Sequence, residues 1–248
     1  MRKNILLGLF VLLQIACSRQ VVHVADLSGK NYQVDERAAE EDPEILAMIA
    51  PYKKTLDAKM TEIIGELDEQ LVKSRPNSKL GNWFTDVLKE EAILLTGKPV
   101  DFAIQNYGGI RVPSLSKGPI SVGKIYELMP FDNMLIVVEL DGKATKLLVD
   151  KIAELNGWPI SDGLSFSIED GKSKDVTISG KPWKESDTYY VGIPDYIANG
   201  GDDCDFLLDY PRENTGKYIR EVVIDHLRRK KVDGKKIIID PTKRILTQ

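Results

Sequence analysis

The chain has 248 residues, with 34 basic and 38 acidic side chains, a formal net charge of −4 and 42% hydrophobic residues. This length allows one large domain or two small ones, and a chain of this size can bury a hydrophobic core. A slightly acidic chain without a clustered basic face is not typical of proteins that bind nucleic-acid polymers, so we expect no such partner.

The N-terminal residues have the pattern of a secretion signal. Arg2 and Lys3 precede the apolar run ILLGLFVLLQIA, and Cys17 follows a small residue. A basic start, a short apolar stretch and a cleavage site form a secretory signal, and a cysteine at the cleavage site is typical of a bacterial lipoprotein. We expect residues 1–16 to be the lipoprotein signal peptide and Cys17 to carry the lipid that anchors the chain to the membrane. Ordinary signal cleavage nearby and a retained anchor helix are the alternatives.

Residues 17–42 are expected to be a membrane tether with a short N-terminal strand or hairpin. His23 alternates with valines in this segment, which favours a plain strand position over a ligand. Only Cys204 remains after lipidation of Cys17, so no intrachain disulfide can form. The one other histidine, His226, lies inside an expected helix, as a surface or hydrogen-bonded residue.

From residue 43 onward helical and strand patterns intermix without a linker, which predicts one mixed α/β domain over residues 43–248. The expected helices are 43–60, interrupted at Pro51, then 79–96 closed by Gly97, then 124–129, 143–155 and 215–231. The expected strands are 60–73 (with a helix as the alternative), 100–106 as a central strand, 118–121, 134–140, 162–170, 175–183, 188–194 and 235–240.

The chain lacks the residue patterns of the common hydrolytic sites. HExxH and CxxC are absent, so a metal site would have to be assembled from carboxylates alone. GxSxG and GxxxxGK are also absent, and two histidines do not support a Ser–His–Asp arrangement. We therefore assign no catalytic and no metal-ligating residue to this chain.

The stretch that ends the 100–106 strand combines polar groups with bare backbone. Asn106 offers an amide that donates and accepts, Gly108 and Gly109 allow close approach of a ligand, and Arg111 adds a planar fork of donors. A simple glycine turn is the alternative interpretation.

Two further loops carry aromatic and polar side chains. Phe131 and Asn133 follow a proline, and Tyr196 precedes an NGGD loop that ends in Asp202. Phe131 as a packing plug is the alternative. Together with Asn106 and Arg111, these side chains suit the binding of a flat base, hydroxyls and phosphate.

Four strings in series, GNWFTD, DFAIQNYGGIR, KIYELMPFDNMLIVVELDG and PDYIANGGDD, resemble the C-terminal domain of the 5'-nucleotidase family. The resemblance runs from about Pro43 to the end of the chain. It implies a single domain of mixed α+β type with four layers, α/β/β/α, that recognises the nucleotide. In that family a separate N-terminal metallophosphatase domain holds two divalent metal ions and performs the hydrolysis, so the resemblance implies no cofactor in this chain.

The resemblance also implies roles for individual residues. Asn106 and Arg111, around the two glycines, would meet ribose and phosphate. Phe131 would stack on the base and Asn133 would contact its edge.

On the opposite side of the base, the resemblance makes Tyr196 the second stacking ring and Asp202 a ribose ligand. Arg75 lies where the family often has another phosphate-directed arginine. Two positions depart from the family pattern. Tyr107 stands where glycine is usual, which would narrow the approach to the backbone, and Asn77 stands where an acidic residue is common.

These expectations combine into one functional hypothesis. The chain would be the nucleotide-recognition half of a split 5'-nucleotidase in the cell envelope, facing the periplasm or the exterior, with a separate metallophosphatase chain performing hydrolysis in nucleotide catabolism. The first alternative is a lipoprotein that binds nucleotides or nucleosides without hydrolysis. A second is an envelope protein whose pocket has decayed.

Overall fold

The structure is a computed structural model that describes residues 29–31 and 42–247. Cys17, His23 and the predicted signal peptide lie outside the described residues, as does most of the predicted tether. The chain divides into two units, residues 1–49 and 50–248. None of the helices in the described part is long and apolar enough to cross a membrane.

Helix α2 (Pro43–Met60) runs through Pro51 without a break, whereas an interruption was predicted there. Proline removes one backbone donor, and the helix continues past it with the Thr55 hydroxyl donating to the Pro51 carbonyl at 3.2 Å. None of the described side chains of α2 is buried.

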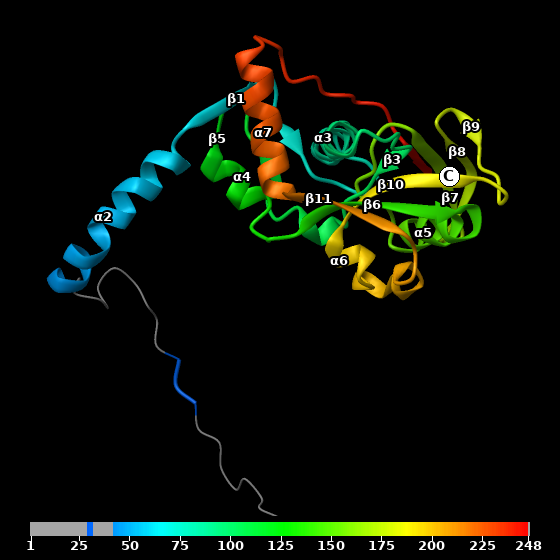
Figure 1. Ribbon diagram of the computed structural model, residues 1–248, viewed down its shortest axis with the longest axis horizontal. Coiled ribbons are helices and arrows are strands. Elements are labelled where there is room, and N and C mark those ends of the chain that lie inside the picture. The colour runs from blue at the N-terminus through cyan, green and yellow to red at the C-terminus, as the bar shows by residue number, and fades with distance from the viewer. Residues whose placement is uncertain (1–28, 32–41, 248) are drawn as a thin grey trace, which may run out of the picture. The chain divides into compact units, whose positions relative to one another are not determined.

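A four-stranded sheet in the order β11-β6-β10-β3 lies at the centre of the second unit (Figure 1). Its strands are β3 (Phe102–Ala103), β6 (Met134–Asp141), β10 (Thr188–Pro194) and β11 (Arg212–Tyr218). β10 pairs antiparallel with β6 and parallel with β3, and β11 pairs antiparallel with β6.

The prediction of a central strand over 100–106 is wrong, because β3 is short and lies at the sheet edge. Its apolar residues are buried all the same, because the segment at Ile160 and Ser161 covers this edge. Ile104 forms a bridge with Ile160, and the Ser161 hydroxyl accepts a hydrogen bond from the Ala103 amide at 2.7 Å. A continuous apolar run therefore reports burial here rather than a place in the middle of the sheet.

A second four-stranded sheet has the order β12-β7-β8-β9. Its strands are β7 (Leu164–Glu169), β8 (Lys172–Ile178), β9 (Lys181–Pro182) and β12 (Ile245–Thr247). Two small antiparallel pairs join β1 (Ile63–Leu67) to β5 (Gly118–Ser121) and β2 (Leu71–Val72) to β4 (Ser114–Leu115). The strand interpretation of 60–73 is thus confirmed over its helical alternative.

The remaining helices are α3 (Lys79–Thr96), α4 (Val122–Leu128), α5 (Gly142–Glu154), α6 (Asp195–Ala198) and α7 (Ile219–Val232). Local signals explain two of their ends. The Ser78 hydroxyl accepts from the Gly81 amide to start α3, and Gly97, at φ 67°, ends it as predicted. α7 starts later than predicted, because residues 215–218 belong to β11.

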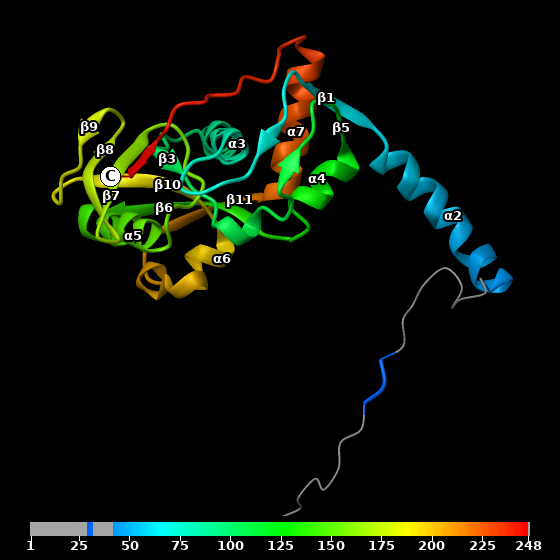
Figure 2. The ribbon, with the colours of Figure 1, turned by 180° about the vertical axis from the view of Figure 1, so that it is seen from behind.

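Two hydrophobic clusters lie on the two faces of the central sheet, and β6 contributes to both by alternation. Leu135 and Val137 face the cluster with α3 and α7, whereas Ile136 and Val138 face the cluster with α5 and the second sheet. Both views show α3 above and α5 below this sheet (Figures 1 and 2). Cys204 is fully buried in the second cluster. The predicted mixed α/β fold is confirmed.

Residues 235–240 were predicted to form the last strand, and this prediction is wrong. They form an irregular arm along α3, and at the end of this arm a side-chain amide bonds the backbone. The Asn82 amide donates to the carbonyls of Asp240 and Thr242 at 3.1 and 3.0 Å. The last strand of the chain is instead β12, which pairs with β7 in parallel.

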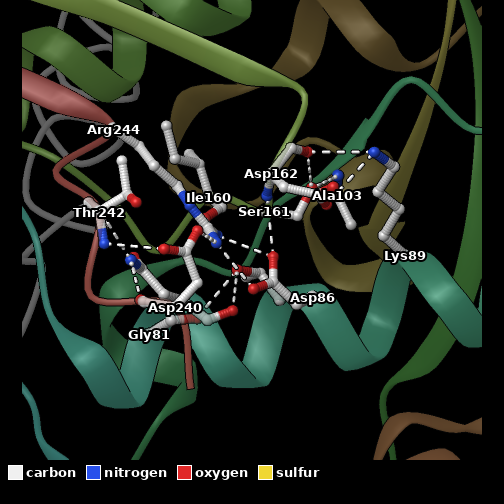
Figure 3. A network of polar contacts seen from close by, with 12 residues as sticks. Gly81, Asp86, Lys89, Ala103, Ile160, Ser161, Asp162, Asp240, Thr242 and Arg244 are labelled. Carbon is white, nitrogen blue, oxygen red and sulfur yellow. Dashed lines mark hydrogen bonds and ion pairs between the residues drawn. The ribbon is translucent and has the colours of Figure 1, made fainter. Parts of the chain in front are cut away.

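Arg244 holds this arm to the domain (Figure 3). Its guanidinium donates to both carboxylate oxygens of Asp86 at 2.8 and 2.7 Å, to Asp240 at 2.8 Å and to the Ile160 carbonyl at 2.7 Å. Asn77 accepts from the Arg244 and Ile245 amides, both at 2.9 Å. An amide rather than a carboxylate suits position 77, because Asn77 also donates to the Ile245 carbonyl.

Candidate functional site

The predicted glycine motif lies in the loop between β3 and β4, where residues 107–109 form a single 3₁₀ turn. A Cβ atom on Gly109 would lie 1.9 Å from the Gln105 amide nitrogen and 2.7 Å from the Asn106 amide oxygen, so a side chain there would displace both amides. A Cβ atom on Gly108 would meet nothing closer than 4.0 Å. Gly109 is therefore required by packing, whereas Gly108 leaves open backbone at the surface.

Asp202 joins this loop to the loop that follows α6. Its Oδ2 accepts from the Asn106 side chain at 2.8 Å, and its Oδ1 accepts from the Tyr196 hydroxyl at 3.0 Å. The hydrogen bond to Asp202 raises the pKa of Tyr196, so the phenol keeps its proton and donates. A Cβ atom on Gly201 would lie 2.6 Å from the Tyr196 ring, so this glycine lets the ring lie against the loop.

The loop before β6 carries Phe131 and Asn133. Asn133 donates from Nδ2 to Asp195 Oδ1 at 2.9 Å, and the same oxygen accepts the Tyr196 amide at 2.8 Å. Asp195 was missed by the sequence analysis, although an aspartate directly before an aromatic residue at a helix start is a recognisable signal. One carboxylate thus connects the loops of the two predicted stacking rings.

The two rings are partly exposed, Phe131 by 39% and Tyr196 by 45%. Among the described residues neither belongs to the two hydrophobic clusters, and the rings do not pair with each other. Phe131 instead lies beside Arg111, whose guanidinium carbon is 5.5 Å from the ring centre. Arg111 also donates to the Gly108 carbonyl at 3.3 Å, so it connects Phe131 to the glycine loop.

A group of three cations lies on one side of this loop. Lys73 Nζ and the Arg75 guanidinium carbon lie 3.9 and 4.1 Å from the centre of the Tyr107 ring. Burial lowers the pKa of Lys73, and the positive charges of Arg111 and Arg75 lower it further. In the described part of the chain, none of the three forms an ion pair with a carboxylate. Their charge is therefore available to an anion.

Lys73 was missed by the sequence analysis, and Tyr107 was noted only as a departure from the family pattern. Lys73 and Arg75 lie two residues apart, just after the end of β2. Tyr107 provides the ring on which both cations lie. The structure thus brings the nine predicted site residues into one connected group, with Lys73, Tyr107 and Asp195 as additions.

An open hollow of about 410 Å³ lies within this group and is lined by Asn133, Asp195, Tyr196, Asn199, Gly200 and Gly201. A larger hollow, of about 510 Å³, lies between α3, α7 and the irregular arm, and none of the predicted site residues lines it. Of the nine predicted residues, Asn133 and Tyr196 line the smaller hollow.

Beside the larger hollow, Glu90, Glu91 and His226 place possible ligand atoms within 4.8 Å of one another. Burial raises the pKa of Glu91, but hydrogen bonds from His226 and Arg229 outweigh this effect and hold its pKa below the usual value. Glu90 pairs with Lys230 at 2.9 Å. Because cations already compensate both carboxylates, this cluster is a partly buried ion-pair network, with Glu90 exposed, rather than a candidate metal centre. His226 is the hydrogen-bonded histidine that the sequence predicted, and it is buried.

Comparison with known proteins identifies the domain type. The family described as "5'-nucleotidase, C-terminal domain" matches residues 63–209. The 5'-nucleotidase of Vibrio vulnificus is 27% identical over 216 residues, which are 82% of this chain and 38% of that protein. Protein UshA of Escherichia coli is 26% identical over 193 residues, 75% of this chain and 33% of UshA.

Solved structures agree with the sequence relatives. The 5'-nucleotidase precursor from Thermus thermophilus matches with a TM-score of 0.68 and 30% identity, over 85% of this chain and 44% of that one. A putative 5'-nucleotidase from Staphylococcus aureus, 15% identical, shares the fold with a TM-score of 0.64. The chain spans a third to less than half of the length of these relatives.

Proposed function

The chain belongs to the 5'-nucleotidase C-terminal domain family, and on this premise we propose that it binds nucleotides as the recognition half of a split 5'-nucleotidase. One observation carries the proposal: three cations that pair with no carboxylate of residues 29–31 and 42–247, two partly exposed rings and the Asp202 carboxylate lie in one connected group. These are the chemical groups that a phosphate, a base and a ribose require.

In this proposal each part of the ligand meets its own side chains. The phosphate is bound by Arg75 and Arg111, whose guanidinium groups match phosphate oxygens with two parallel donors, and by Lys73, whose ammonium adds a point charge. The ribose hydroxyls donate to Asp202. The base stacks on Tyr196 and on Phe131. The Phe131 ring lies beside Arg111 and has to turn from there toward the base.

Hydrolysis belongs to a second chain in this proposal. A metallophosphatase chain would hold two divalent metal ions, and such ions activate water for attack on a phosphate ester. The residues of this chain bind and orient the nucleotide for that attack. Lipid on Cys17 would anchor the chain in the cell envelope, facing the periplasm or the exterior.

Calorimetric titration of the full-length chain with adenosine and adenosine monophosphate tests the recognition role. Arg111→Ala should weaken binding of the monophosphate about 10- to 150-fold, the size of a hydrogen bond to a charged group, and weaken adenosine far less. Arg228→Ala is the matched control, because Arg228 is exposed and paired with Glu62 away from the site. Equal losses for both ligands contradict the phosphate role of Arg111, and a wild-type chain that binds neither ligand refutes the proposed function.

Phosphate release tests the split arrangement. The chain alone, freed of contaminating phosphatase, should release no phosphate from nucleoside monophosphates with zinc or manganese. Addition of a metallophosphatase chain that lacks its own recognition domain should restore release. Binding without any restored release would favour the alternative, a non-catalytic nucleotide- or nucleoside-binding lipoprotein. Metal-dependent turnover by the chain alone would contradict both the split arrangement and the non-catalytic alternative.

A further inference from the structure

The side-chain amide of Asn133 has a defined orientation. Its hydrogen-bond partner is the Asp195 carboxylate, 2.9 Å away, and a carboxylate accepts but does not donate. Asn133 must therefore turn its amino group toward Asp195. Its carbonyl oxygen makes no hydrogen bond to any described residue, and Asn133 is one of the residues that line the 410 Å³ hollow. The neighbouring oxygen Asp195 Oδ2 is a second acceptor without a partner in this part of the chain.

A second amide on the same wall has the opposite orientation. Asn199 accepts at Oδ1 from Arg212 Nη1 at 3.0 Å, and a guanidinium donates but does not accept. Arg212 cannot turn away easily, because it also donates to the carbonyls of Ala198 and Leu207, both at 2.9 Å. The Asn199 amino group therefore has no partner among the described residues and can donate to a ligand.

We infer that this hollow selects bases whose edge carries an amino group next to a ring-nitrogen acceptor, as in adenine and cytosine. The inference rests on the proposed function, in which the hollow receives the base beside Tyr196. The amino group of such a base donates to the Asn133 carbonyl, and its ring nitrogen accepts from the Asn199 amino group. Charged neighbours set both orientations, so neither amide can invert to suit a different base.

Replacement of the amino group of the base by a carbonyl reverses the donor and acceptor roles of both groups on its edge. Inosine and uridine differ from adenosine and cytidine in this way, since a carbonyl takes the place of the amino group and the ring nitrogen becomes a donor. A carbonyl would then face the Asn133 carbonyl, and an N–H would face the Asn199 amino group. Two acceptors or two donors that face each other repel and both lose a hydrogen bond, which costs more than a lost hydrogen bond between neutral groups.

Titration of the full-length chain with the four bare nucleosides tests the inference, because without phosphate the three cations do not mask the contribution of the base. Adenosine should bind about tenfold or more tightly than inosine, the usual effect of one hydrogen bond lost with its partner unsatisfied. Cytidine should likewise bind more tightly than uridine. Equal affinities within each pair overturn the inference while leaving the proposed function intact. A chain that binds none of the four overturns both.

Two variants locate the selectivity. Asn199→Asp keeps an acceptor for Arg212 but presents a second oxygen in place of the amino group, so the adenosine-to-inosine ratio should fall about tenfold. Asn214→Asp, at an exposed position on β11, makes the same change in charge and should leave the ratio unchanged. Asp195→Ala frees the Asn133 amide to rotate and should also reduce the ratio. An unchanged ratio in Asn199→Asp and Asp195→Ala, or an equal fall in Asn214→Asp, overturns the inference.

Discussion

Truncation of Phe131 or Tyr196 to Ala distinguishes rings that bind a ligand from rings that fill the core. The exposed fractions of 39% and 45% leave little more than half of each side chain covered. Full burial of an aromatic side chain removes about 150–250 Å² from water. Because alanine retains part of the covered area, truncation loses about 60–100 Å². At about 25 cal/mol per Å² this is at most about 1.5–2.5 kcal/mol of stability.

The loss of affinity should be of similar size or larger, because stacking on a base contributes about 1–3 kcal/mol per ring. That range corresponds to about 5- to 150-fold in affinity for adenosine. A fully buried ring such as Phe84 behaves differently, and Phe84→Ala should cost about 3–5 kcal/mol of stability.

Thermal melting beside calorimetric titration with adenosine measures both quantities on the full-length chain. For a domain of this size each kcal/mol lowers the melting temperature by about 2–4 °C. Leu147→Ala is a matched control, because Leu147 is 45% exposed on α5, away from the site. If Phe131→Ala and Tyr196→Ala lower the melting temperature as much as Phe84→Ala does, and the folded variants bind adenosine normally, the rings fill the core and the stacking role is refuted.

Three further predictions concern the scaffold. Arg244→Ala removes two of the three hydrogen bonds to the Asp86 carboxylate and leaves only the one from the Asp162 amide, so urea unfolding should show a loss of about 3–5 kcal/mol; a loss under about 1 kcal/mol would contradict the anchoring role of Arg244. A hydrogen bond from Arg244 holds the pKa of Asp240 at about 2, below the unfolded value of about 3.9. Its stabilisation is therefore complete above about pH 4 and is lost as the pH falls toward 2, so Asp240→Asn should be less stable than the wild type at pH 6 and equally stable near pH 2, as measured by urea unfolding. Burial raises the pKa of Cys204 to about 12, so iodoacetamide at about pH 8 should label this thiol only after unfolding, as read by peptide mass; rapid labelling of the folded chain would contradict it.

Sequence alone determined the elements whose signals are local. Helix α3 begins and ends where Ser78 and Gly97 indicate, because capping residues satisfy backbone groups of their own helix. The junction of β6 and α5 falls at Asp141 for the same reason, since its carboxylate accepts from the Ala144 amide. The loops that carry the site were likewise marked by their own glycines, aromatic residues and prolines.

Tertiary structure alone decided the features that depend on partners distant in the chain. β3 is buried although it lies at an edge, because the segment at Ile160 covers it, and the irregular arm is held at Asp240 by Asn82, which is far away in sequence. Lys73 and Asp195 joined the site for the same reason, through the ring of Tyr107 and the amide of Asn133. A periodic pattern reports which side of an element is buried, but it carries no information about which polar group faces it from another element. That pairing exists only once the elements have packed.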